Sequence, residues 1–122
     1  MSATRCCLLL LLALAAVGCG GKQAVPTVAG GAPERGKAAI LRYGCAACHF
    51  IPGIPGHGAN VGPPLVNVAA RAHLGGVLPN TPVNLVRWLR NPPQVDPRTA
   101  MPNLGVSQAE ATDIAAFLYA TH

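Results

Sequence analysis

The sequence contains few aromatic and few charged side chains. Aromatic residues make up only 4% of the 122 residues, and charged residues only 11%. A small domain with so few large side chains buries little apolar surface, so the chain alone provides a weak core. Lysine and arginine outnumber aspartate and glutamate by 9 to 4, but these charges are scattered rather than clustered. Such a diffuse basic excess argues against a nucleic-acid partner.

An apolar run long enough to cross a bilayer is also absent. The stretch from Leu8 to Val17 is ten residues long, whereas a transmembrane helix needs about 20. It follows the short basic segment Met1–Arg5, and this combination is typical of a secretory signal peptide. We therefore predict a signal peptide over residues 1–18 and export of the protein.

The end of this signal contains a further pattern. Ala16-Val17-Gly18-Cys19 resembles the lipobox of bacterial lipoproteins, in which the signal is cut before the cysteine and the thiol then receives a lipid. Ala16 stands where that family usually has leucine, so ordinary cleavage and an uncleaved anchor stay open. We expect Cys19 to be lipidated and to hold the protein at the periplasmic side of a bacterial membrane.

The segment after the signal differs in composition from the remainder of the chain. Residues 19–33 are rich in glycine, proline and small side chains and show no apolar periodicity. This composition predicts a flexible tether. Residues 34–122 then have about the length of one small domain, and they contain no visible repeat.

Three stretches of the domain have helix signals. Pro33-Glu34 opens the first helix, which runs to Tyr43 and stops at Gly44. A second begins at Thr81-Pro82 and ends at Asn91, because two prolines come next. The third begins with Ser107-Gln108-Ala109-Glu110, which is a capping box.

Long irregular segments separate these helices. Residues 50–64 and 94–106 are crowded with proline and glycine, and residues 65–74 hold at most a helical turn or two. We predict an all-α fold of three or more helices joined by long loops. Loops of this length are uncommon in a compact domain unless they have a function.

The cysteines provide the main chemical signal. Cys6 and Cys7 leave with the signal peptide, and Cys19 is expected to be lipidated, which leaves Cys45 and Cys48. These two lie in the sequence GCAACH, in which His49 comes directly after the second cysteine. A zinc ion, a reversible disulfide and a covalently attached haem all use such residues.

The rest of the sequence separates these three possibilities. A structural zinc site needs four ligands, and no second C-x-x-C or H-x-x-x-H motif is present. A thioredoxin-like dithiol lies in a βαβ unit, and no strand and helix patterns alternate here. Two thiols one helical turn apart can instead add to the two vinyl groups of a haem, with the adjacent histidine as an iron ligand. The apolar macrocycle would also supply the missing core.

We therefore predict one haem c, bound covalently through Cys45 and Cys48 and ligated by His49. Met101 is the favoured second iron ligand, because Pro97 and Pro102 stiffen the loop around it. The other candidates are His57, His73 and His122.

From Glu34 onward the chain resembles a class I cytochrome c. The resemblance rests on Cys45–His49, Gly62–Leu65 (GPPL), Leu89–Pro92 (LRNP), Pro97–Pro102 (PRTAMP) and a closing helix with Asp113, Ile114, Phe117 and Leu118. It implies an all-α fold in which the first and last helices cross, with Gly36 allowing close approach of Phe117.

The resemblance also implies roles for four further residues. The carbonyl of Pro63 would accept a hydrogen bond from Nδ1 of the ligating histidine. Arg71 and the hydroxyl of Thr99 would each lie near a haem propionate. Trp88 would pack beside the macrocycle near the methionine ligand.

An iron with both axial positions filled has no open site for a substrate. We therefore expect outer-sphere electron transfer rather than catalysis, and no small-molecule substrate. Arg87, Arg90 and Arg98 are candidates for docking an acidic redox partner. The resemblance is nearest to bacterial cytochrome c domains that accompany respiratory haem–copper oxidases, which implies an oxidase or dehydrogenase as partner. Two alternatives stay open: a fixed haem subunit of a larger oxidoreductase, and a five-coordinate haem that binds a gas or peroxide.

Overall fold

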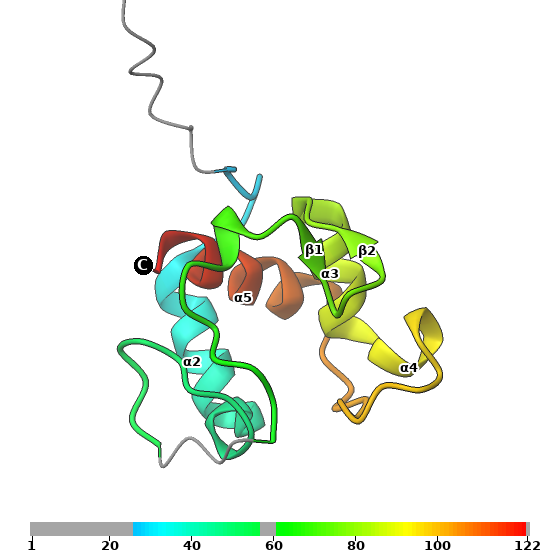
Figure 1. The fold of residues 1–122 in the computed structure, drawn as a ribbon. Helices are drawn as coiled ribbons and strands as arrows, with labels where there is room; N and C mark the ends of the chain where they lie inside the picture. The colour runs from blue at the N-terminus through cyan, green and yellow to red at the C-terminus, as the bar shows by residue number, and fades with distance from the viewer. Residues whose placement is uncertain (1–25, 57–60, 122) are drawn as a thin grey trace, which may run out of the picture.

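The computed structural model describes residues 26–56 and 61–121. The signal peptide, Cys19, His57 and His122 lie outside the described residues. The described chain is mainly helical (Figure 1). Its α-helices are α2 (Pro33–Tyr43), α3 (Pro82–Arg90), α4 (Pro92–Val95) and α5 (Gln108–Ala120), and its 3₁₀ helices are η2 (Cys45–Ala47) and η3 (Val68–Ala70). None of the described helices is long and apolar enough to cross a membrane.

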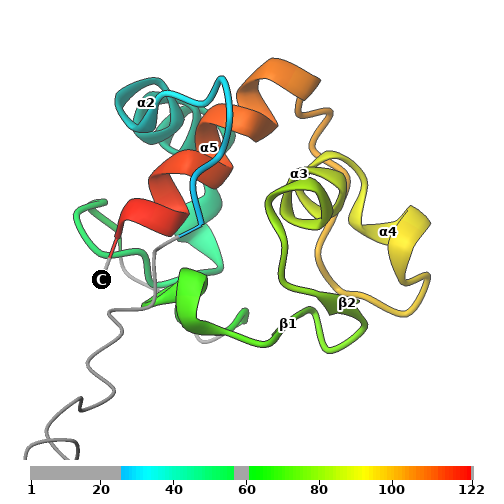
Figure 2. The same ribbon diagram turned by 90° about the horizontal axis from the view of Figure 1, so that it is seen from above.

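Helices α2 and α5 cross and form the centre of the core (Figures 1 and 2). Ala39 and Ile40 of α2 and Ile114 and Ala115 of α5 are all buried. At the crossing, a Cβ on Gly36 would collide with the backbone carbonyl of Asp113. The close approach expected at Gly36 is therefore present, but its partner is the backbone of Asp113 rather than Phe117.

The helix ends reflect local chemistry. Gly44 adopts a left-handed conformation with φ of 69° and ends α2. Thr81 Oγ1 accepts a hydrogen bond from the backbone N–H of Asn84 at the start of α3. At the start of α5, the side chains of Ser107 and Glu110 cap each other's backbone N–H, so the predicted capping box is confirmed.

One short helix and a two-stranded hairpin were not predicted. Helix α4 begins directly after α3 and extends into the segment expected to be irregular, because proline is accepted in the first turn of a helix. Strands β1 (His73–Leu74) and β2 (Leu78–Pro79) form an antiparallel hairpin. Its turn contains Gly75 and Gly76 with φ of 54° and 75°, a conformation that glycine adopts without strain.

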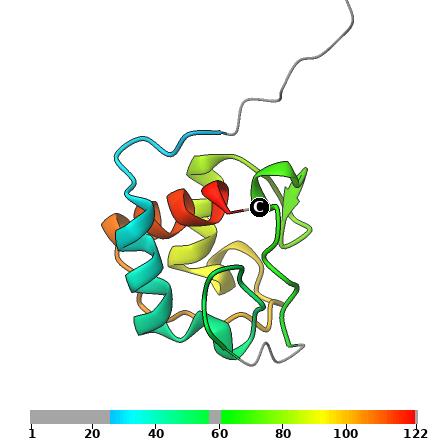
Figure 3. The same cartoon turned by 90° about the vertical axis from the view of Figure 1, so that its left-hand side faces the viewer.

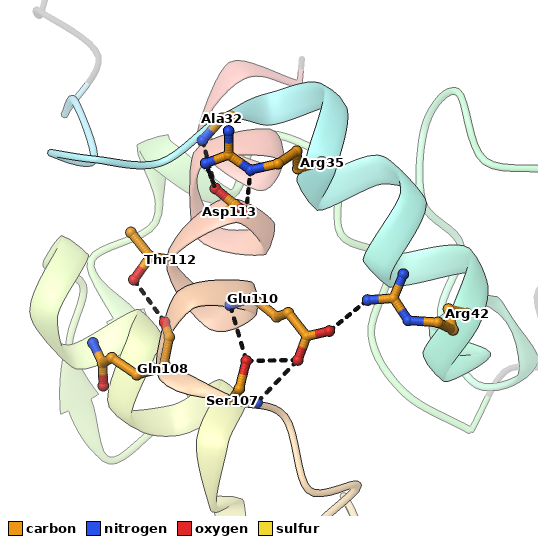
Figure 4. A network of polar contacts seen from close by, with 8 residues as sticks. All are labelled: Ala32, Arg35, Arg42, Ser107, Gln108, Glu110, Thr112 and Asp113. Carbon is orange, nitrogen blue, oxygen red and sulfur yellow. Dashed lines mark hydrogen bonds and ion pairs between the residues drawn. The ribbon is translucent and has the colours of Figure 1, made fainter.

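The end of the expected tether is part of the folded domain. Val28 packs against the core, and a Cβ on Gly31 would come within 2.7 Å of the Ala116 side chain. The backbone N–H of Ala32 donates to Asp113 Oδ1 at 2.8 Å, and Arg35 donates to both oxygens of the same carboxylate (Figure 4). Residues 28–33 are thus docked on α5, which differs from the flexible segment expected there.

Candidate functional site

The C-x-x-C-H motif lies at the C-terminal end of α2, where the chain tightens into η2 (Figures 1 and 3). The backbone N–H groups of Cys48 and His49 both donate to the carbonyl of Cys45, at 3.2 and 3.1 Å. This one turn holds the thiols of Cys45 and Cys48 and the imidazole of His49 on a single compact segment. Both cysteines are free and half-buried.

Burial raises the pKa of the Cys45 thiol above its ordinary value. A reactive dithiol depends instead on a lowered pKa, because the thiolate is the nucleophile. The environment of Cys45 therefore disfavours a thioredoxin-like redox pair.

The ring of His49 is oriented by a single hydrogen bond. Its Nδ1 lies 2.8 Å from the carbonyl oxygen of Pro63. A carbonyl oxygen only accepts hydrogen bonds, so Nδ1 must be the protonated nitrogen in the neutral ring. Nε2 then keeps its lone pair and is therefore the ring atom that can bind a metal. Of the two adjacent prolines, Pro63 supplies this acceptor.

Gly62 is a site residue whose role the sequence did not reveal. A Cβ at this position would lie 2.6 Å from Nδ1 of His49 and closer still to Cε1. The backbone N–H of Gly62 donates to the carbonyl of Cys48 at 2.9 Å, and that of Leu65 donates to the carbonyl of Phe50 at 2.8 Å. Residues 62–65 therefore lie directly against the motif, and only glycine leaves room for the imidazole.

Exposed apolar side chains lie next to the predicted ligands along the chain. Phe50, directly after His49, is 55% exposed, and Val61, which precedes Gly62, is 69% exposed. Leu104, shortly after Met101, is also exposed. Two free thiols, an imidazole with an available Nε2 and exposed apolar side chains close to these residues in the sequence together fit a covalently attached haem.

Met101 lies on the segment between α4 and α5. Its side chain is half-buried and packs against the edge of the core. Its backbone N–H donates to Thr99 Oγ1 at 3.2 Å, so the Thr99 hydroxyl stabilises the loop that contains Met101. His73, an alternative ligand, is exposed at the start of β1.

Two other predicted site residues have clear neighbours. Trp88 is half-buried on α3, and a Cβ on Gly75 would lie 2.5 Å from its indole ring. The hairpin turn therefore packs directly on Trp88. The guanidinium of Arg71 donates to the backbone carbonyls of Pro64 and Val66, so within the described chain its partners are in the loop just after Pro63.

A second polar cluster joins the C-terminal end of α2 to the first turn of α5 (Figure 4). Glu110 accepts hydrogen bonds from the hydroxyls of Ser107 and Tyr43, at 2.6 and 2.7 Å, and pairs with Arg42. These donors lower the pKa of Glu110 to about 2, the hydroxyl of Ser107 contributing most.

A groove of about 760 Å³ lies between the N-terminal segment, α3 and the start of α5. Arg87 and Arg90 line it, and no acidic side chain is among the described residues that do so. Arg90 donates to Gln108 Oε1 at 2.9 Å. Arg98, by contrast, is paired with Asp96 at 3.3 Å, so the groove has basic charge without a carboxylate partner.

The family model for cytochrome c, described as "Cytochrome c", matches residues 33–121. A search of the curated proteins found no match. The family match begins at the first residue of α2 and includes the C-x-x-C-H motif, Met101 and all of α5.

Proposed function

Because the chain belongs to the cytochrome c family, we propose that it is a monohaem carrier of single electrons. Membership confirms the small, mainly helical fold expected from the sequence, and it implies haem-based electron transfer with covalently bound haem c. When bound, the haem supplies an iron that changes between the ferric and ferrous states. We propose which residues of this chain hold the haem and what their arrangement implies for electron transfer.

The thiols of Cys45 and Cys48 would attach the haem, and His49 Nε2 would ligate its iron from one face. The hydrogen bond from His49 Nδ1 to Pro63 is the observation that supports this proposal most strongly. It leaves the correct nitrogen free and restricts rotation of the ring.

Met101 is our proposed ligand for the opposite face, with Thr99 holding its loop. Ligation by histidine and methionine leaves no open position and favours the ferrous state. We therefore propose that the protein transfers electrons and is not itself an enzyme. For Arg71 and Trp88 we propose, as the resemblance implies, contact with a propionate and with the macrocycle.

We further propose that an acidic surface of a respiratory oxidase or dehydrogenase docks on this protein. Arg87 and Arg90 support this, because they line a groove without a carboxylate among its described residues. Paired Arg98 is a weaker candidate. Charge of this kind speeds encounter more than it tightens binding.

A lipid on Cys19 is our proposal for holding this carrier at the periplasmic side of the membrane, after removal of residues 1–18. The supporting feature is the small-residue pattern before Cys19. One acyl chain binds a membrane only weakly, so stable anchoring would need more than one chain.

Covalent attachment tests the proposal. The mass of the purified wild-type protein is expected to exceed that of its chain by one haem, and the protein is expected to be reduced and reoxidised by one electron. The Cys45→Ser, Cys48→Ser double variant should lose the added mass after denaturation. A wild-type protein that yields a haem-free chain on denaturation would contradict the proposal.

A further inference from the structure

Asn80, which lies between β2 and α3, uses its whole side-chain amide in hydrogen bonds. Its Nδ2 donates to the carbonyls of Val68 and Arg71, at 2.7 and 2.8 Å. Its Oδ1 accepts from the hydroxyl of Tyr119 at 2.6 Å. Tyr119 belongs to α5 and is 1% exposed. Asn80 therefore ties the turn at residues 68–71 to the buried face of the last helix.

The same turn is connected to the loop that orients His49. The guanidinium of Arg71 reaches back to the carbonyls of Pro64 and Val66. Pro64 is the neighbour of Pro63, the hydrogen-bond acceptor of His49 Nδ1. A continuous series of hydrogen bonds and short chain segments thus runs from Tyr119 on α5 to the imidazole.

This series is a second connection between the motif and α5, in addition to the one through α2, whose Tyr43 donates to Glu110 of α5. Residues 62–65 are bonded directly to residues 48–50, so the loop and the motif form one unit. The connection through α2 holds the cysteine end of this unit. The hydrogen bonds of Arg71, Asn80 and Tyr119 join its loop end, residues 62–65, to α5.

We propose that Asn80 and Tyr119 are positioning residues that hold the Pro63 carbonyl in place and thereby orient the His49 ring. The inference rests on the proposed role of His49 as an iron ligand. Outer partners of a ligating histidine fix its ring plane and its basicity. Loss of either side chain also leaves a hydrogen-bonding group without its partner in a half-buried or buried place.

The test compares full-length, haem-loaded variants by NMR. The readout is the rate at which the His49 Nδ1–H exchanges with solvent. We expect Asn80→Ala to raise this rate by about tenfold or more, by analogy with the effect of removing outer-shell partners at metal sites. Tyr119→Phe, which removes one hydroxyl and keeps the ring, should give a smaller increase and a shift of reduction potential in the same direction as Asn80→Ala.

Ile114→Val is the control, because Ile114 is buried at the α2–α5 crossing and makes none of these contacts. It should lower thermal stability and leave the exchange rate and potential at wild-type values. If Asn80→Ala does not fold, the exchange rate of the His49 Nδ1–H in Tyr119→Phe alone decides the test. Wild-type exchange in the folded Asn80 and Tyr119 variants would overturn the inference. Absence of an iron-shifted His49 signal in the wild-type protein would instead overturn the proposed function.

Discussion

The imidazole of His49 is restrained on two sides by adjacent residues of one loop. The Pro63 carbonyl holds Nδ1, and the Cα of Gly62 lies where any side chain would meet the ring. No positive φ is found at Gly62, so the reason for glycine there is space rather than backbone conformation. This makes Gly62 a direct probe of the ring's position.

Gly62→Ala should displace the His49 ring, because the new methyl group would overlap Cε1 and Nδ1. We expect a lower yield of haem-loaded protein and an altered visible spectrum in what remains. The comparison is Gly76→Ala, where φ is 75° and nothing lies within 4 Å of the added Cβ. That change should cost about 1 kcal/mol or more of stability through backbone strain and leave the spectrum unchanged. Identical spectra for Gly62→Ala and wild type would contradict this view of the site.

At the scale of elements, the contact between α2 and α5 combines close packing with two carboxylate clusters. Gly36 lets the backbones meet, Asp113 binds Arg35 and the Ala32 N–H, and Glu110 binds Arg42 and Tyr43. Since α2 leads directly into the C-x-x-C-H motif, these clusters also fix the position at which the motif begins.

Because both clusters depend on a charged carboxylate, we expect the protein to lose stability in acid. The pKa of Glu110 is lowered from 4.5 to about 2 in the folded protein. A lowered pKa means that the charged form favours folding, so its contribution is complete above about pH 4.5 and disappears as the pH falls toward 2. Glu110→Gln, which can still cap α5, should therefore flatten the fall in thermal midpoint across this range. The fall in thermal midpoint should not disappear completely in Glu110→Gln, because the pKa of Asp113 is lowered too.

Glu34→Gln is the matched control, since Glu34 is also in the first turn of a helix but forms no ion pair among the described residues. Its acid profile should match that of the wild type. An unchanged slope in Glu110→Gln would show that Glu110 contributes nothing to acid stability.

At the scale of the whole molecule, the sequence predicted the helices well and their connections poorly. Helices α2, α3 and α5 begin and end at local signals such as Thr81, Gly44 and the Ser107 capping box. Docking of the N-terminal segment depends on Asp113, 81 positions from Ala32, and no local pattern reports such a contact. The hairpin had a signal in Gly75-Gly76, but its strands are only two residues long.

The candidate site also combines residues identified by local signals with residues whose contacts are distant in sequence. Cys45, Cys48 and His49 form a local motif, and the sequence singled them out once the missing zinc ligands and the missing βαβ pattern were considered. Pro63 was implied by resemblance, and its hydrogen bond to His49 is present. Gly62, Gly75 and Asn80 act through neighbours distant in sequence, His49, Trp88 and Tyr119. Their roles therefore became visible only once the chain was folded.

We propose that His49 and Met101 together close the iron to outside ligands, so that the whole molecule transfers electrons and binds nothing at the metal. The most direct measurement is the visible spectrum of the reduced wild-type protein before and after addition of carbon monoxide. We predict no change for the wild type and a new carbon monoxide complex for Met101→Ala. A wild-type protein that binds carbon monoxide as readily as Met101→Ala would show that Met101 does not ligate the iron.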